Sequence, residues 1–300
     1  MIFAQIREVL GKPYYQNNNC LIYNADCLDA MKLLSDECIN LTVTSPPYNI
    51  GKEYEKPMSL NSFLNWCRHW IAEVYRITES NGAFWLNLGY IQIPNRAKAI
   101  PLPYLLWEAI PFYLIQEVVW NYGAGVAGKS FFSPRNEKFL WYVKDENQYT
   151  FNLDDVRDPN VKYPKQKKNG KIKVNPLGKN PTDVWQIPKV TSGKNRASKE
   201  RTAHPAQFPI AIVERIIKAC SNKGDLIFDP FIGSGTTAVV AQNLARFVIG
   251  FELKVDYCDI AAERIERAAG LPRHERVQTS IFEIEQLELD KVNNEASPLR

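Results

Sequence analysis

A run of four residues, Ser45, Pro46, Pro47 and Tyr48, has the composition of a site that polarises an amino group. Consecutive prolines fix φ and lack N–H donors, so they predict a stiff turn with the carbonyl groups of Ser45 and Pro46 directed outward. Two fixed acceptors can bond both hydrogens of the amino group on a cytosine or adenine ring, which frees the nitrogen lone pair for a methyl donor. Tyr48 offers a flat face for an extruded base. The alternative interpretation is a proline-stiffened surface loop.

A second chemical signal is the glycine-rich stretch at residues 229–238. Gly233, Gly235 and Ala238 fit the pattern Gly-x-Gly-x-x-Gly/Ala between a predicted strand and a predicted helix. Glycines there let the backbone turn tightly and approach a ligand, and the helix start offers free N–H groups. Glu252 ends the next predicted strand, where a carboxylate can accept both hydroxyls of a ribose. This pattern predicts a nucleoside site, with a purely structural turn as the alternative.

The residues of the turn favour one kind of nucleoside. The stretch lacks the Lys-Ser/Thr ending of a phosphate-binding P-loop. Asp229 stands at the start of the turn, where its carboxylate would repel a pyrophosphate and attract a ligand that carries an ammonium and a sulfonium. The sequence therefore predicts S-adenosylmethionine rather than a dinucleotide as the cofactor.

Alternating strands and helices surround both stretches. Apolar and β-branched runs predict strands at residues 21–23, 39–44, 83–86, 113–120, 226–228 and 247–251. Helical spacing predicts helices at residues 28–34, 62–74, 104–109, 209–220, 236–245 and 255–269, with Ser59 or Ser62 as the cap of the second. This alternation predicts an α/β fold with a mostly parallel sheet and right-handed crossovers.

The middle of the chain is different. Residues 121–203 are rich in Gly, Pro and Asn and are predicted to be mostly loops, with one strand at 139–143 and low order around 165–175. The segment 157–201 contains thirteen Lys or Arg and three acids, a net charge of +10, whereas the whole chain carries +4. Such asymmetry is typical of a segment that faces a polyanion, and a solvated basic loop is the alternative.

Bulk properties exclude several classes of protein. No apolar run among the 300 residues is long enough to cross a bilayer, and residues 1–12 lack the order of a secretory signal. Six scattered cysteines and three separated histidines show no metal-ligand spacing, so no metal site is predicted. Free buried thiols indicate a reducing, cytoplasmic location.

These residues bring the chain close to a known family. Thr-Ser-Pro-Pro-Tyr at 44–48, His-Pro-Ala-Gln-Phe-Pro at 204–209, Asp-Pro-Phe-Ile-Gly-Ser-Gly-Thr-Thr at 229–237 and Ile-Gly-Phe-Glu at 249–252 occur in this order. The chain resembles the permuted, beta-type amino DNA methyltransferases, in which the catalytic motif precedes the cofactor motif. The resemblance covers about residues 21–269 and implies a seven-stranded sheet with helices on both faces.

The resemblance also implies roles for individual residues. Ser45, Pro46, Pro47 and Tyr48 would form the catalytic segment. The cofactor would be held by Asp229, Phe231, Gly233, Ser234, Gly235, Thr236, Thr237 and Glu252, with His204, Pro205 and Phe208 at its methionine end and Asp26 at its adenine. For Asp26 the alternative is a helix N-cap, and for His204 a structural hydrogen bond.

The same resemblance divides the chain into parts. Residues 1–120 would be the catalytic half, 121–203 the target-recognition region, 204–270 the cofactor half and 271–300 a peripheral tail. Double-stranded DNA would bind through the basic 157–201 segment. Within the 121–203 region, Arg135, Arg157 and the 165–173 lysines offer phosphate contacts. Trp141 and Tyr142 lie in a strand-like run and are interpreted as core residues, whereas Tyr163 and Trp185 are candidates for packing or stacking.

The base that is modified depends on one position. Serine at 45 is typical of family members that resemble N4-cytosine methyltransferases, whereas Asp or Asn there is typical of N6-adenine ones. We therefore expect a site-specific N4-cytosine methyltransferase of a restriction–modification system, with N6-adenine as the alternative. A cognate endonuclease sharing the site and a homodimer are both compatible with the sequence. A nicotinamide-dependent oxidoreductase and a DNA-binding protein without catalysis are the competing hypotheses.

Overall fold

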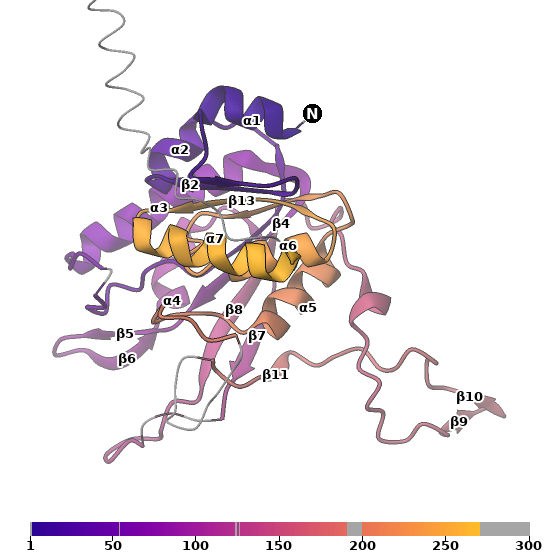
Figure 1. Cartoon of the computed structure of the whole chain (residues 1–300). Helices are drawn as coiled ribbons and strands as arrows, with labels where there is room; N and C mark the ends of the chain where they lie inside the picture. The colour runs from indigo at the N-terminus through magenta and orange to yellow at the C-terminus, as the bar shows by residue number, and fades with distance from the viewer. Residues whose placement is uncertain (1, 54, 124, 126, 191–199, 271–300) are drawn as a thin grey trace, which may run out of the picture.

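The computed structural model describes residues 2–53, 55–123, 125, 127–190 and 200–270. In this part of the chain a central sheet of nine strands has the order β1-β2-β13-β12-β3-β4-β8-β7-β11 (Figure 1). Its strands, in that order, are Tyr15–Gln16, Cys20–Asn24, Phe247–Glu252, Leu226–Asp229, Ile39–Thr44, Thr78–Leu88, Asn136–Val143, Tyr113–Asn121 and Val184–Gln186. Two short hairpins lie outside it: β5 Tyr90–Ile93 with β6 Ala97–Pro101, and β9 Lys167–Lys168 with β10 Lys171–Ile172.

The central sheet is mostly parallel. Strands β2, β13, β12, β3 and β4 run in one direction, and β8 lies antiparallel between β4 and β7. The seven strands from β2 to β7 form the predicted α/β sheet, which is thereby confirmed. The two-residue β1 and the three-residue β11 extend it at its edges.

Helices cover both faces of the sheet. One apolar core packs under α1 Ile2–Leu10, α2 Cys27–Leu33, α3 Leu60–Ile77 and α4 Leu102–Leu106, and a second packs under α5 Ile210–Cys220, α6 Thr236–Asn243 and α7 Val255–Ala269. Figure 1 shows α6 and α7 in front of the sheet. Two 3-10 turns, η1 Trp107–Ala109 and η2 Leu153–Val156, join other elements. Among the described helices, none is long and apolar enough to cross a membrane.

Stacked tryptophans fill the second core. The ring of Trp85 on β4 lies between Trp141 and Trp185, with centroid distances of 5.4 and 5.7 Å and nearly parallel planes. Trp141 and Tyr142 are buried, so their interpretation as core residues is confirmed. Trp185 is buried as well, so its role is packing rather than stacking on a base. Tyr163, in contrast, is exposed.

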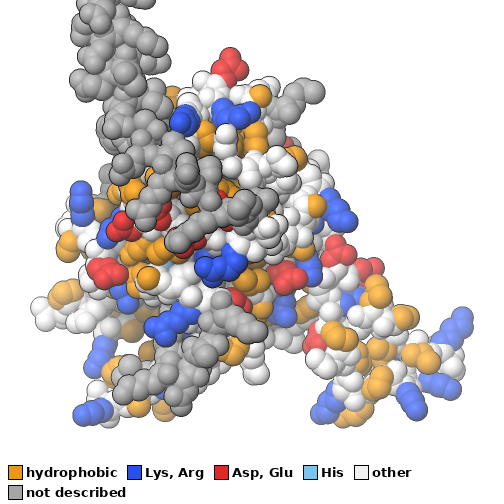
Figure 2. Space-filling view, viewed as in Figure 1, with side chains coloured by type: hydrophobic (Ala, Val, Ile, Leu, Met, Phe, Trp, Pro, Cys, Tyr) orange, Lys and Arg blue, Asp and Glu red, His pale blue; other side chains and the backbone are white. Residues whose placement is uncertain are grey.

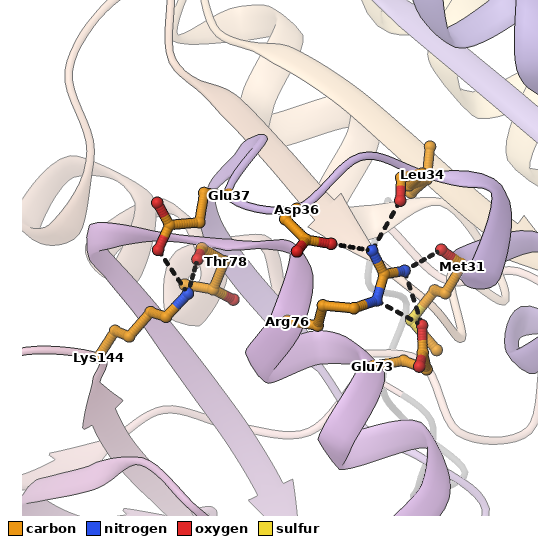
Figure 3. Close-up of polar contacts among 8 residues, drawn as sticks. All are labelled: Met31, Leu34, Asp36, Glu37, Glu73, Arg76, Thr78 and Lys144. Carbon is orange, nitrogen blue, oxygen red and sulfur yellow. Dashed lines mark hydrogen bonds and ion pairs between the residues drawn. The ribbon is translucent and has the colours of Figure 1, made fainter.

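Arg76 and Lys144 fasten the amino end of the sheet (Figure 3). The Arg76 guanidinium, at the end of α3, donates to the carbonyls of Leu34 and Met31, which end α2, and pairs with Asp36 and Glu73. A cation that bonds the last carbonyls of a helix satisfies acceptors that have no intrahelical partner. Lys144, just after β8, donates to the Thr78 carbonyl and pairs with Glu37. These contacts hold the segment before β3 and the start of β4 in place.

Most predicted elements exist, and the differences lie in short or exposed ones. Strand β3 and helix α7 have the predicted bounds, and Ser59 caps α3 by accepting from the Ser62 N–H. Helix α1, the β5–β6 hairpin, β1 and β11 were not predicted. Each is short, or is set by its neighbours rather than by its own periodicity.

Within the basic 157–201 segment, the β9–β10 hairpin forms a projecting arm. Strands β9 and β10 pair through a two-residue turn in which Asn169 and Gly170 have φ of 51° and 78°, the conformation that Asn-Gly favours in tight hairpins. The low order expected around 165–175 is therefore replaced by a small hairpin. Its four strand residues are exposed, and Figure 1 shows the hairpin standing away from the sheet beyond β11. Residues 191–199 of the basic segment and the predicted tail at 271–300 lie outside the described residues.

Candidate active site

The two predicted motifs meet at the carboxyl ends of two adjacent parallel strands. β3 pairs with β12, and their ends lead into the loop of residues 45–58 and the turn of residues 230–235. From β12 the chain crosses to β13 on one side, and from β3 it crosses to β4 on the other. Ligands in open α/β sheets bind in the crevice at such a reversal of strand order. The topology thus places both motifs where a ligand site is expected.

Asp229 joins the two motifs. Its Oδ1 accepts from the Thr44 hydroxyl at 2.7 Å and from the Phe231 N–H at 3.1 Å, and its Oδ2 accepts from the Thr237 hydroxyl at 2.7 Å. Burial raises the pKa of Asp229 to about 6, while the hydrogen bonds from Thr237 and Thr44 oppose the rise. The carboxylate therefore holds the end of β3 to the start of α6. A contact of Asp229 with the cofactor stays a prediction.

The hydroxyl groups of Ser45 and Tyr48 belong to one partly buried hydrogen-bond network. The Tyr48 hydroxyl lies 2.9 Å from Ser45 Oγ and donates to Asn87 Oδ1 at 2.6 Å. Asn87, at the end of β4, is 1% exposed and donates from its amide to the Lys138 carbonyl. The Tyr48 ring leaves no room for a side chain at position 89, since a Cβ on Gly89 would lie 2.9 Å from it. Asn87 and Gly89 therefore set the position of Tyr48, and the sequence did not single out either one.

The prolines hold the carbonyls that the sequence predicts as acceptors. Pro46 is buried, and Ser45, Pro47 and Tyr48 are half-buried. Within the described residues, no donor contacts the carbonyl oxygens of Ser45 and Pro46. This agrees with a pair of acceptors kept for a ligand.

Glu55 organises the rest of the 45–58 loop. Its carboxylate accepts hydrogen bonds from four consecutive or nearly consecutive backbone amides at 2.7 to 3.1 Å, those of Tyr48, Asn49, Ile50 and Lys52. Hydrogen bonds to an ionised carboxylate are stronger than neutral ones. Glu55 thus fixes the backbone that follows the prolines. Glu55 was not predicted from the sequence, because only the fold of the loop brings these amides together.

The glycines of the 230–235 turn are required by close neighbours. A Cβ on Gly233 would lie 2.8 Å from His204 Nε2, and one on Gly235 would lie 2.8 Å from the Ala261 Cβ. Both glycines have positive φ, 49° and 76°, which side chains rarely adopt. The Gly233 N–H donates to the Glu252 carboxylate at 3.1 Å. The turn, His204 and Glu252 therefore lie together, as the motifs imply.

Arg264 stabilises the 230–235 turn through hydrogen bonds from α7. This α7 residue is 8% exposed, and its Nη1 donates to the Ser234 carbonyl at 2.6 Å and to the hydroxyls of Ser234 and Thr236. Burial lowers the pKa of Arg264 to about 10, which still leaves it charged at neutral pH. A buried cation beneath the turn fixes the backbone of the turn and adds positive potential there. Helical periodicity did not distinguish Arg264 from surface arginines.

His204 lies against the turn in a neutral form. Its Nδ1 accepts from the Ala206 N–H at 3.2 Å, so the neutral ring carries its proton on Nε2, the atom that faces Gly233. Burial, together with the charges of Arg264 and Lys254, lowers the pKa of His204 to about 4. The ring also packs edge-on against Tyr257, with centroids 4.3 Å apart.

The remaining predicted residues have mixed surroundings. Phe231 packs in the first core against Trp66 and Trp70, and Phe208 packs in the second core while its carbonyl accepts from the Thr236 hydroxyl. Asp26 caps α2 by accepting from the Leu28 N–H. Asp26 lies two residues after Asn24, the β2 residue that pairs with Glu252. Pro205 is half-buried beside His204. Capping leaves the Asp26 carboxylate further lone pairs, so its cofactor contact stays a prediction.

Comparison with known proteins places this arrangement in a family. A sequence profile of the DNA methylase family, which groups N6 and N4 methyltransferases, matches residues 39–263. The chain belongs to this family. The DNA methylase is 60% identical over 266 residues to the type II methyltransferase M.ScaI of Streptomyces caespitosus, an alignment that spans 89% of this chain and 88% of the relative. It is 31% identical over 264 residues to the DNA adenine methyltransferase YhdJ of Escherichia coli K12, which spans 85% of each chain.

Solved structures share the fold of this DNA methylase. The cytosine-N4-specific PvuII DNA methyltransferase superposes with a TM-score of 0.67 at 20% identity and covers 94% of this chain and 95% of its own. M1.HpyAVI, solved as a complex with S-adenosylmethionine, superposes with a TM-score of 0.54 at 23% identity over 82% and 98%. The predictions of an S-adenosylmethionine-dependent DNA methyltransferase and of its sheet are confirmed.

Proposed function

We propose that this DNA methyltransferase modifies the exocyclic N4 of a cytosine extruded from double-stranded DNA, at a specific site and as part of a restriction–modification system. The observation that carries the choice of base is Ser45 at the first position of the Ser-Pro-Pro-Tyr segment. The PvuII enzyme, which shares the fold, is cytosine-N4-specific. The similarity to M.ScaI, a type II methyltransferase, supports the restriction–modification context.

Adenine N6 is the second candidate base. The similarity to the adenine methyltransferase YhdJ favours it. Cytosine N4 and adenine N6 are both exocyclic amines, so the same pair of acceptors serves either base. The choice therefore depends on how the Ser45 and Asn87 side chains match the edge of the base.

The residues around the 230–235 turn fit S-adenosylmethionine, which supplies an activated methyl group. Glu252 offers a carboxylate to ribose hydroxyls, and the free N–H groups at the start of α6 offer donors to a carboxylate. The Nε2–H of His204 adds a neutral donor beside Gly233. This donor set suits a ligand with both a ribose and an amino-acid end. We assign Asp26, Pro205 and Phe208 to the border of the same site.

The Ser45–Tyr48 segment would activate the amine. The Ser45 and Pro46 carbonyls accept its two hydrogens, which draws the nitrogen toward sp³ geometry and frees its lone pair. Because these acceptors are held by prolines, they need no reorganisation during the reaction. A strong general base is unnecessary, since the proton leaves only after the new bond to carbon has formed. Tyr48, fixed by Asn87, would support the extruded base.

The basic segment would hold the DNA backbone. Lys and Arg bind phosphates and set affinity and register, whereas base-edge contacts set the target sequence. The exposed β9–β10 hairpin carries Lys167, Lys168 and Lys171. Arg157 pairs with Asp154 and also bonds the Gly178 carbonyl, so it supports the arm as well.

The test is to incubate the purified protein with labelled S-adenosylmethionine and unmethylated duplex DNA. The product is then digested to nucleosides and the modified base is identified by mass. We expect N4-methylcytosine, and sequencing of the product would map the target site. N6-methyladenine would overturn the choice of cytosine and leave the family unchanged. Cofactor binding without transfer to any DNA would instead indicate a DNA-binding protein without catalysis.

A further inference from the structure

Two phenylalanines lie on the surface between β7 and β8. Phe132 is 100% exposed and its neighbour Phe131 is 48% exposed. Scattered exposed apolar residues are normal, but adjacent ones at the same tip indicate a surface that becomes covered on binding. The connection that carries them joins the carboxyl end of β7 to the start of β8. It therefore lies at the same edge of the sheet as the 45–58 loop.

The turn that presents these rings is closed. The Gly128 N–H donates to Ser133 Oγ at 2.8 Å. A Cβ at position 128 would lie 2.5 Å from the Phe131 carbonyl oxygen, so only glycine fits there. Phe132 thus stands on a folded turn rather than on an extended chain. The backbone that carries the ring is therefore already folded, which lowers the entropy cost of ordering it on binding.

The β5–β6 hairpin contributes positive charge beside the turn. Lys98 Nζ lies 4.4 Å from the centroid of the Phe131 ring, a cation–π contact between hairpin and turn. Residues 89–101 and 122–136 together contain Arg96, Lys98, Lys129 and Arg135 and no acidic residue. Figure 2 shows Lys and Arg side chains at the lower left, over this part of the molecule, as well as on the arm at the right. The charge favours an anionic partner.

The β5–β6 hairpin also borders the 45–58 loop. A cavity of about 600 Å³ is lined by Asn49 and Ile50 on one side and by residues 90–94 and 98–99 of the hairpin on the other. The Tyr90 hydroxyl donates to Asn136 Oδ1 at 2.9 Å, which ties the hairpin to the start of β8. Loop, hairpin and turn therefore form one continuous surface at the carboxyl edge.

We propose that the 128–133 turn and the β5–β6 hairpin form a contact surface for duplex DNA, in which Phe132 inserts between base pairs beside the extruded nucleotide. Arg96 and Lys98 bind phosphates on the flank of the inserted ring. An apolar wedge compensates for the stacking that the extruded base loses, and cations next to it neutralise the backbone. This surface rests on the proposed extrusion of a base and is separate from the β9–β10 arm.

The wedge is tested with Phe132→Ala on two short duplexes that carry the mapped site. In one the target base is paired, and in the other it faces a base with which it cannot pair. We expect kcat/KM on the paired duplex to fall by about tenfold or more, because unstacking and unpairing cost a few kcal/mol. The mispaired duplex should restore most of the rate. The control is Trp107→Ala, another exposed aromatic, which lies in η1 before the amino end of β7.

The other outcomes overturn the wedge. They are an unchanged rate on the paired duplex, an equal loss on both duplexes, or a shift in oligomeric state without a loss of transfer. Because the ring of Phe132 is wholly exposed, Tm should not change, and a lowered Tm would also count against a binding role. Whichever base is methylated, the comparison of paired with mispaired substrate is unaffected. Failure of the wedge is thus distinguishable from failure of the cytosine assignment.

The phosphate contacts are tested with Arg96→Ala against the charge-matched Lys223→Ala. Lys223 is exposed in the turn before the amino end of β12. The plot of log Kd against log salt concentration should become shallower by about 0.9 for Arg96→Ala, the contribution of one phosphate contact. Lys223→Ala should leave the slope unchanged. Equal slopes for the two variants would exclude Arg96 from the DNA surface.

Discussion

The Thr44 hydroxyl donates a 2.7 Å hydrogen bond to the Asp229 carboxylate, between residues 185 positions apart in the sequence. Thr44 directly precedes the Ser-Pro-Pro-Tyr segment, and Asp229 begins the glycine-rich turn. Both groups are buried, with exposures of 0% and 3%. The bond therefore couples the position of the Ser-Pro-Pro-Tyr segment to that of the glycine-rich turn. In the proposed mechanism these two stretches hold the amine and the cofactor, and methyl transfer needs both partners in line, so we expect this contact to support the reaction.

Removal of the Thr44 hydroxyl should destabilise the protein. In Thr44→Val a buried carboxylate loses a donor, which costs about 1 to 3 kcal/mol of unfolding free energy. The control is Thr42→Val on the same strand, because the buried Thr42 hydroxyl has no hydrogen-bond partner among the described residues. Thr42→Val should be neutral or stabilising. Denaturant unfolding measures both, and equal losses would contradict the role of the Thr44–Asp229 bond.

Glu55→Gln should slow methyl transfer without weakening cofactor binding. The amide of Gln would place N–H donors against the backbone N–H groups that the carboxylate now accepts. Since the 45–58 loop would loosen, kcat should fall about tenfold or more, in line with the strength of hydrogen bonds to a charged group. The control is Glu53→Gln in the same loop, where Glu53 Oε1 faces Tyr257. Equal effects of the two variants on kcat would exclude a positioning role for Glu55.

Pro47→Ala should lower the rate of transfer more than the affinity for the cofactor. In the proposed mechanism the Ser45 and Pro46 carbonyls act mainly in the transition state, so loosening them should affect kcat. The added backbone freedom is worth about 1 kcal/mol, or about fivefold in rate. Pro57→Ala, at the exposed far end of the loop, is the control. Equal losses of cofactor affinity and of kcat in Pro47→Ala would mean that the segment is only structural.

The pH dependence of stability should reveal His204 and Asp229 separately. The pKa of His204 is lowered from 6.5 to about 4, so the unfolded state binds the proton first and the native state loses stability as pH falls from 6.5 to 4. The pKa of Asp229 is raised from 3.8 to about 6, so the native state loses stability as pH rises from 3.8 to 6. In the wild type the two contributions oppose each other.

Single variants should separate these contributions. As pH falls from 6.5 to 4, the difference in unfolding free energy between His204→Gln and the wild type should shift in favour of the variant by up to about 3 kcal/mol. Asp229→Asn should gain a similar amount relative to the wild type as pH rises from 3.8 to 6. Denaturant unfolding across this range measures both differences. Differences that do not vary with pH would show that these groups titrate as in the unfolded chain.

The sequence predicted the fold where its signals were local and repeated. The β-branched run at β3 and the heptad-like apolar spacing of α7 fix those elements through their own side chains. The β5–β6 hairpin was not predicted, because its short strands pair with each other outside the central sheet. For the same reason the contact between this hairpin and the Phe131 ring could not be predicted from the sequence.

By itself the sequence determined the motifs, their order and the family. Ser45–Tyr48 and the 229–237 stretch are contiguous runs, so their chemistry can be inferred from the residue types without knowledge of the fold. Only the tertiary structure decided which groups support them. Glu55, Asn87 and Arg264 contact the motifs through backbone amides, hydroxyls and a buried guanidinium. Nothing in the type or spacing of these residues marks such contacts. They exist because the carboxyl ends of β3, β4 and β12 converge at one edge of the sheet, and that convergence is a property of strand order.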